Sequence, residues 1–116
     1  MSVFKIVSRS DWESIKSSGA SEFTGLGIDL ADKYIHLSKL EQVPGTLAKF
    51  FAGRTDLLLL QVNVEPLGER LKWEGGSLGE AELFPHLYGG GFPLSAVVAV
   101  HTVGFDEETK THSIPK

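Results

Sequence analysis

The chain has 116 residues, of which 41% are hydrophobic and 22% charged, a balance typical of one globular domain with its own core. It has no cysteine, which excludes disulfides, zinc–thiolate sites and thiol nucleophiles. The net charge is −4 and the eleven basic residues are scattered, so nucleic acid is a disfavoured partner, whereas a small ligand is compatible with this composition.

The first third of the chain predicts a strand, a short helix and a loop. Val3–Val7 is largely apolar and β-branched, which favours a strand. Ser10 to Glu13 match a capping box, so we expect a helix capped by Ser10 that ends near Gly19. Residues 19–32 are rich in Gly, Ser and Asp and indicate a connecting loop.

Tyr34–Ser38 predicts a second strand, with Ile35 and Leu37 on one face and His36 and Ser38 on the other. From Lys39 onward, apolar residues recur at helical spacing, which predicts a core-facing helix with Pro44 in its first turn and Gly53 as its terminator. The recurring residues are Leu40, Val43, Leu47, Phe50 and Phe51.

The second half predicts three further strands. Leu57–Val64 is expected in mid-sheet, Leu71–Glu74 as a short strand, and Ala96–Val103 as a late central strand, with a turn-rich region over Phe84–Gly91. Strands interrupted by two main helices without regular alternation favour an α+β fold. We expect one domain over residues 1–105 and a polar C-terminal tail over 106–116.

No segment approaches the ~20 apolar residues of a membrane span, and the N-terminal residues lack the pattern of a signal peptide. We therefore expect a cytoplasmic protein that does not bind membranes. The sequence does not indicate an oligomeric state.

His36 is the first candidate for chemistry, because a neutral imidazole in a strand can bind a ligand hydroxyl or act as a general base. The alternative is a core histidine bonded to backbone. Ser38 is predicted on the same face, but it also begins a second capping-box pattern, Ser38 to Glu41, and its hydroxyl is equally suited to capping.

Glu74 and His86 are the other two catalytic candidates. Glu74 precedes two glycines, and its carboxylate is suited to ribose hydroxyls or an oxocarbenium ion, although an exposed loop glutamate is the simpler interpretation. His86 lies between Phe84 and Tyr88, before a run of glycines that lets backbone approach a ligand, and Tyr88 is a binding candidate. The alternative for His86 is a structural corner.

Metal and nucleotide-loop motifs are not supported. His36, Glu74, His86 and His101 are of the right ligand types, but no pair has a recognised metal-ligand spacing, so we predict no metal. The glycine clusters lack both the dinucleotide fingerprint and the P-loop lysine.

Several segments together resemble the family called domain of unknown function 952, over roughly residues 3–104. They are Phe4-Lys5-Ile6-Val7, Trp12, Asp29-Leu30-Ala31-Asp32, Ile35-His36-Leu37-Ser38, Phe51-Ala52-Gly53, Leu71-Lys72-Trp73-Glu74 and Phe84-Pro85-His86-Leu87-Tyr88-Gly89. The resemblance implies an ADP-ribosyltransferase-like split β-sheet around a cleft, which holds NAD in active relatives. It does not by itself imply an activity.

Ile35-His36-Leu37-Ser38 and the following helix are also similar to RNA 2′-phosphotransferases, in which a Val-His-Leu-Ser strand belongs to the active site. This similarity implies roles for His36 and Ser38. RNA is disfavoured as substrate, because the acidic chain has only three arginines, Arg9, Arg54 and Arg70. ADP-ribosyltransferases carry a histidine or arginine in the first strand. The first strand predicted here has neither, but Arg9 lies just beyond it and is a binding candidate.

Three hypotheses follow. The first is a cleft for a nucleotide-type ligand such as NAD or ADP-ribose, with an activity related to ADP-ribosyl transfer. The second is a noncatalytic module that recognises a metabolite or a partner protein. The third gives the histidines a purely structural role, in which case replacing either by alanine should cost about 1–3 kcal/mol of stability.

Overall fold

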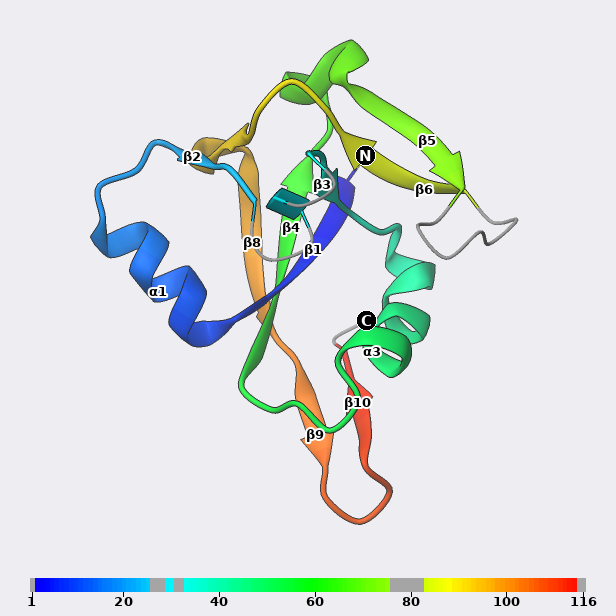
Figure 1. Ribbon diagram of the computed structural model, residues 1–116. Helices are drawn as coiled ribbons and strands as arrows, with labels where there is room; N and C mark the ends of the chain where they lie inside the picture. Colours follow the sequence, from blue (N-terminus) through cyan, green and yellow to red (C-terminus); the bar gives the residue numbers. More distant parts are fainter. Residues whose placement is uncertain (1, 26–28, 31–32, 76–82, 115–116) are drawn as a thin grey trace.

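The computed structural model describes residues 2–25, 29–30, 33–75 and 83–114. Figure 1 shows three long strands, β1, β4 and β8, through the centre of the molecule, with α1 and α3 on opposite sides. The helices are α1 (Arg9–Ser17) and α3 (Val43–Phe50), with 3-10 turns at Leu40–Gln42, Glu65–Arg70 and Leu94–Ala96. The strands are β1 (Ser2–Ser8), β2 (Glu22–Phe23), β3 (Ile35–His36), β4 (Leu57–Asn63), β5 (Leu71–Gly75), β6 (Leu83–Leu87), β7 (Phe92–Pro93), β8 (Val97–Thr102), β9 (Gly104–Asp106) and β10 (Thr111–Ser113).

The antiparallel sheet β1-β4-β8 is buried on both faces of β1 and β4. One face packs in a first core with Trp12 of α1, and the other packs in a second core with Val43 and Leu47 of α3. Burial on both faces explains why these two strands are nearly continuous apolar runs. The β1 and β4 residues of the first core are Val3, Val7, Leu58, Leu60 and Val62, and those of the second are Phe4, Ile6, Leu57 and Leu59.

A second sheet, in the order β3-β6-β5, carries the polar residues of interest. Its register aligns Ile35, Leu87 and Leu71 on one face, which packs against the first core. His36, His86 and Lys72 are aligned in the same way on the other face. A β-bridge between Phe4 and Ser38 joins this sheet to β1.

The α+β class and the predicted positions of β1, β4, β5 and both helices are confirmed. The cap of α1 was predicted wrongly. Ser8, not Ser10, accepts the backbone amide of Asp11, at 3.1 Å. The helix begins at Arg9, directly after Ser8 pairs with Leu57, so Ser10 falls inside the first turn.

Two predictions in the second half were wrong. Residues 83–87, expected to belong largely to a turn, form β6, and β8 lies at an edge of its sheet in the described part of the chain. Pro85 and the glycines after Tyr88 are typical of turns, so the alternation of residues that would indicate β6 was not recognised. In β8, Val98 and Val100 remain exposed, because a β-branched run looks alike at the edge and in the centre of a sheet.

The polar residues 106–116 include β10, which pairs with β9 and lies against α3, while Ile114 packs on the second core. Asp106 closes the β9–β10 turn by accepting the backbone amides of Glu108 and Thr109. Residues 26–28 and 31–32 of the expected loop 19–32 lie outside the described residues. None of the described helices is long and apolar enough to cross a membrane.

Two glycines provide a test of this packing. A β carbon at Gly91 would overlap the carbonyl oxygen of Phe23, so Gly91→Ala should lower the free energy of unfolding by roughly 1–3 kcal/mol. At Gly45, in α3, a β carbon would meet open space, and Gly45→Ala should raise it by about 0.5 kcal/mol. Denaturant unfolding of both variants measures this, and equal effects would contradict the predicted contact.

Candidate functional site

One face of the β3-β6-β5 sheet gathers two histidines, two tyrosines and a glutamate. Strand alternation places residues 72 and 74 of β5 and residues 86 and 88 of the β6 segment on the face that carries His36. The ring of Tyr34 lies 4.6 Å from His36, 4.4 Å from His86 and 5.1 Å from Tyr88 between centroids, and the two imidazoles are 5.5 Å apart. We call this surface, made by Tyr34, His36, Lys72, Glu74, His86 and Tyr88, the polar face.

Asp29 and Lys5 contact both the backbone and the ring of His36. Oδ1 of Asp29 accepts the backbone amide of His36 at 2.9 Å and lies 2.6 Å from its Nδ1. The ammonium of Lys5 lies 2.7 Å from Oδ2 of Asp29 and donates to the carbonyl of His36 at 3.0 Å. The Asp29 side chain is 1% exposed and that of Lys5 11%, so these charges form a buried pair.

The electrostatics of this group favour an ionised Asp29. Burial alone would raise the pKa of Asp29, but the hydrogen bonds from His36 and the charge of Lys5 outweigh it and lower the pKa to about 2. Burial lowers the pKa of Lys5, because its ammonium is removed from water, while Asp29 opposes this effect. With an ionised carboxylate beside it, Nδ1 of His36 carries a proton and donates to Oδ1.

His86 has its own carboxylate. Nδ1 of His86 lies 2.9 Å from Oε1 of Glu74, and the Tyr88 hydroxyl donates to the same oxygen at 2.6 Å. The bonds from Tyr88 and His86 lower the pKa of Glu74. The bond to Glu74 raises the pKa of Tyr88 to about 12, because it stabilises the protonated phenol.

Two atoms of Glu74 and His86 have no hydrogen-bond partner among the described residues. Both bonds to Glu74 end on Oε1, so Oε2 has no partner among the described residues, and the side chain is 42% exposed. Every fully buried side-chain nitrogen or oxygen of the described chain has a hydrogen-bond partner. Nε2 of His86 also has no hydrogen-bond partner among the described residues, although the side chain is only 3% exposed.

Arg70 fixes the turn that follows β6. Its guanidinium donates to the carbonyls of Tyr88, Gly89 and Gly91 at 3.0–3.3 Å. Gly89 and Gly90 have φ of 77° and 112°, values that side chains rarely adopt. Arg70 and the glycines therefore position Tyr88, and the guanidinium is committed to backbone.

The structure brings four of the six predicted site residues together: His36, Glu74, His86 and Tyr88. Ser38 is buried and its hydroxyl is 3.4 Å from that of Thr46 in α3. It does not cap the following turn, where Gln42 instead accepts the amide of Lys39. Arg9 pairs with exposed Asp56 beyond the end of β1, and that end, Ser8, is about 13 Å along the strand from the Phe4–Ser38 bridge.

Sequence reasoning did not select Lys5, Asp29 or Tyr34 as site residues. Lys5 had a usable signal, because a lone charge within an apolar strand requires a buried partner. Tyr34 shares the alternation that placed His36. Asp29 lies in a segment without periodicity, and its role depends on tertiary contacts.

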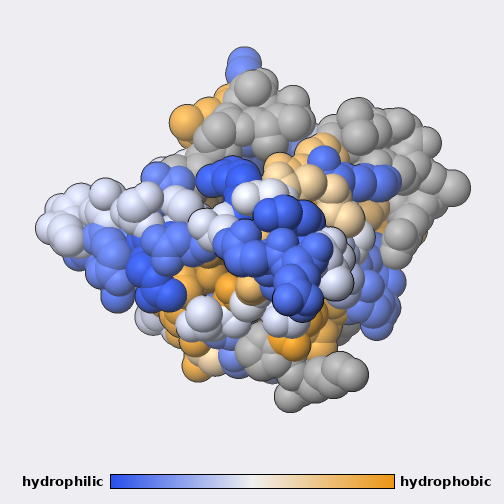
Figure 2. Space-filling model, turned by 90° about the horizontal axis from the view of Figure 1, so that it is seen from below, coloured by the Kyte–Doolittle hydropathy of each residue, from blue (hydrophilic) through white to orange (hydrophobic). Residues whose placement is uncertain are grey.

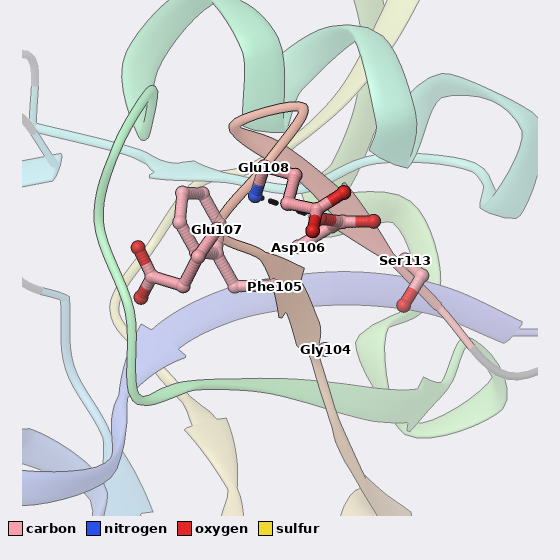
Figure 3. Close-up of a pocket in the computed structure, with 6 residues that line it drawn as sticks. All are labelled: Gly104, Phe105, Asp106, Glu107, Glu108 and Ser113. Carbon is pink, nitrogen blue, oxygen red and sulfur yellow. Dashed lines mark hydrogen bonds between the residues drawn. The ribbon is translucent and has the colours of Figure 1, made fainter.

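An open concavity lies elsewhere, at the β9–β10 hairpin, and is lined by residues 104–108 and Ser113. Figure 3 shows the bond from the Glu108 amide to Asp106 that closes the turn. Seen from below in Figure 2, the surface around this hairpin end is mainly hydrophilic, with hydrophobic areas beside it. Among the described residues no group of three or more His, Cys, Asp or Glu is placed to hold a metal.

Comparison with known proteins agrees with the predicted family resemblance. A family model described as "Protein of unknown function (DUF952)" matches residues 6–100. The chain belongs to the DUF952 family. A crystal structure of CC0527 from Caulobacter crescentus is 40% identical, with a TM-score of 0.83 and coverage of 97% of this chain and 94% of that chain. The solution structure of CC0527 is 41% identical, with a TM-score of 0.77 and coverage of 99% and 91%. No curated protein matches the chain.

The Asp29 interactions predict an acid-dependent stability. Because the folded pKa of about 2 lies below the ordinary 3.8, the contribution of ionised Asp29 is present above pH 4 and lost as the pH falls from about 4 to 2. It should amount to about 2 kcal/mol. Asp29→Asn should flatten this part of the stability curve, measured by urea unfolding, whereas Asp56→Asn, at an exposed pair, should not. Parallel curves for Asp29→Asn and the parent protein would contradict this.

The Tyr88–Glu74 bond predicts an unusual tyrosine titration. In Tyr34→Phe, which leaves Tyr88 as the only tyrosine, tyrosinate absorbance should appear with a midpoint well above the ordinary 10, although below the value of the parent protein because the small contribution of Tyr34 is lost. Adding Glu74→Gln should move the midpoint back toward 10, because the acceptor loses its charge. Circular dichroism over the same range separates titration from unfolding. An unchanged midpoint would show that the bond is absent.

Proposed function

We propose that the polar face binds a nucleotide-type ligand through a ribose and that the protein is a transferase related to ADP-ribosyltransferases. The observation that carries this proposal is the pair of open acceptor atoms, Oε2 of Glu74 and Nε2 of His86, on adjacent strands. Their residues are joined by the 2.9 Å contact between Nδ1 and Oε1, so the two acceptors are held in a fixed relation.

The chemistry of these atoms favours hydroxyl groups. When Nδ1 of His86 donates its proton to the Glu74 carboxylate, Nε2 of the imidazole is a hydrogen-bond acceptor. Two neighbouring acceptors match the two hydroxyl donors of a ribose, whereas a phosphate presents acceptors and would be repelled. Lys72, exposed on the same face and close enough to lower the pKa of Glu74, is placed to bind a phosphate attached to that ribose.

The family resemblance provides the reaction class. In ADP-ribosyl transfer, the bond from ribose to nicotinamide breaks, nicotinamide leaves with the electron pair, and an acceptor oxygen attacks the ribosyl carbon. Glu74 would stabilise the positive charge on the ribose, Nε2 of His86 would hold a ribose hydroxyl, and the proton of the attacking hydroxyl would pass to solvent. The joining of two three-stranded sheets at the Phe4–Ser38 bridge supports a split-sheet architecture of this kind.

RNA is a weaker candidate substrate, because the arginine side chains are already engaged. Arg9 pairs with Asp56 and Arg70 with backbone carbonyls, while Arg54 lies over the ring of Phe51. The composition and the described helices are compatible with action in the cytoplasm on a diffusible ligand.

Titration of ¹⁵N-labelled protein with ADP-ribose and with NAD tests the proposal. Signals of Glu74, His86 and Tyr88 should shift, and Glu74→Gln should weaken binding about tenfold through loss of a charged acceptor. Glu108→Gln, which removes an exposed carboxylate from the β9–β10 turn, is the matched control and should bind normally. An absence of shifts at millimolar ligand, or equal binding of inorganic phosphate, would overturn it.

Release of nicotinamide from NAD distinguishes a transferase from a binding module. A transferase should release it, and His86→Ala should abolish the release. Binding of ADP-ribose without any release would instead show a noncatalytic module that recognises a metabolite.

A further inference from the structure

The turn between β6 and β7 is held on two sides. On one side, the carbonyl of Arg70 accepts the amide of Tyr88 at 3.0 Å. Nη1 of Arg70 donates to the carbonyls of Tyr88 and Gly89, at 3.1 and 3.3 Å, and a second nitrogen, Nη2, donates to that of Gly91 at 3.0 Å. On the other side, Gly91 lies so close to the carbonyl of Phe23 that a β carbon would overlap it. The turn is therefore fixed relative to both β5 and β2.

The glycines of this turn do not explain why an arginine holds it. Gly89 and Gly90 have φ of 77° and 112°, so the chain can turn here without help from a side chain. Glycine also leaves the backbone more conformational freedom than any other residue. The three bonds of Arg70 remove that freedom, and a β carbon at Gly89 would lie only 3.2 Å from Cδ of the arginine.

The fixed turn determines the direction of the Tyr88 side chain. Glu74 lies opposite Phe84 in the register of β5 and β6, whereas Tyr88 follows the end of β6. A side chain standing upright on the sheet at Tyr88 would point away from Glu74. The hydroxyl of Tyr88 instead donates to Oε1 of Glu74 at 2.6 Å, so the ring leans back along the sheet.

This bond restricts the carboxylate of Glu74. With one donor, a carboxylate can turn about its last carbon–carbon bond and exchange its two oxygens. Here Nδ1 of His86, at 2.9 Å, and the Tyr88 hydroxyl approach the same oxygen from different residues. Their agreement on Oε1 leaves Oε2 as the oxygen without a partner among the described residues.

We propose that Arg70 is a positioning residue for ligand binding at the polar face. By fixing the turn it holds the Tyr88 hydroxyl on Oε1 of Glu74, which leaves Oε2 for the ribose. Tyr88, predicted from the sequence as a ligand-binding residue, is then a positioning residue as well. The role of Oε2 rests on the proposed function, whereas the link from Arg70 to Glu74 belongs to the ligand-free protein.

The pKa of Glu74 in ligand-free protein tests this link. Arg70→Lys keeps the positive charge, but one ammonium cannot occupy the positions of both Nη1 and Nη2. Because the bond from Tyr88 lowers the pKa of Glu74, Arg70→Lys should raise that pKa toward the ordinary 4.5, and Tyr88→Phe should do the same. Carboxyl ¹³C spectra of glutamate-labelled protein across the acid range measure it. An unchanged pKa in folded Arg70→Lys would overturn the inference.

Arg54→Lys is the matched control for this titration. Its guanidinium lies over the ring of Phe51, 5.1 Å from the centroid, and makes no contact with the polar face. The pKa of Glu74 should be the same in Arg54→Lys as in the parent protein. Should Arg70→Lys not fold, Tyr88→Phe keeps the backbone and arginine bonds of the turn, and an unchanged pKa of Glu74 in that variant would equally overturn the inference.

Affinity for ADP-ribose tests the consequence for the ligand. Arg70→Lys and Tyr88→Phe should each weaken binding about fivefold, as expected for loss of one hydrogen bond. The double variant should bind no more weakly than either single variant, because both changes remove the same bond. Additive losses would show that Tyr88 contacts the ligand itself or that Arg70 acts by another route, and would count against the proposal.

The two proposals fail in different ways. If ADP-ribose does not bind but the pKa of Glu74 rises in Arg70→Lys, the proposed function is wrong and the link from Arg70 to Glu74 stands. If ADP-ribose binds equally well to the parent protein, Arg70→Lys and Tyr88→Phe, the proposed function stands and Arg70 is not a positioning residue.

Discussion

The ammonium of Lys5 lies beside an apolar core of this protein. The geometry of the polar face depends on the ion pair that this ammonium forms with Asp29. Lys5 belongs to β1, a strand buried on both faces, and its side chain is largely removed from water. In such surroundings a charge requires a partner of opposite sign. Asp29 supplies it, and the same carboxylate also bonds to His36, which couples the central sheet to the β3-β6-β5 sheet.

The polar face combines one carboxylate that is enclosed with one that is open. The Asp29 side chain is buried, whereas Glu74 accepts bonds from His86 and Tyr88 through Oε1, and its Oε2 has no partner among the described residues. The two carboxylates of the face therefore differ in exposure, at 1% for the Asp29 side chain and 42% for that of Glu74. Under the proposed function, Oε2 of Glu74 and Nε2 of His86 would accept hydrogen bonds from the hydroxyl groups of a sugar.

Local patterns predicted much of the chain, but not the neighbours of each site residue. Apolar runs located β1 and β4, and the alternation at Tyr34–Ser38 placed Ile35 and Leu37 in the core and His36 on the polar face. The same alternation did not reveal that the Ser38 hydroxyl turns to Thr46. For β6 the pattern was hidden, since Pro85 and the glycines after Tyr88 are turn residues in most contexts.

The sequence by itself determined the family, the α+β class and which residues had chemistry to offer, because periodicity and residue type are local properties. Only the tertiary structure decided which of them meet. The pairing of β6 with both β3 and β5 places His86 beside His36 and Glu74. The buried ammonium of Lys5 pairs with the carboxylate of Asp29. Both outcomes depend on contacts between residues far apart in the chain, whose register and charge pairing are set by packing of the whole core and not by any one segment.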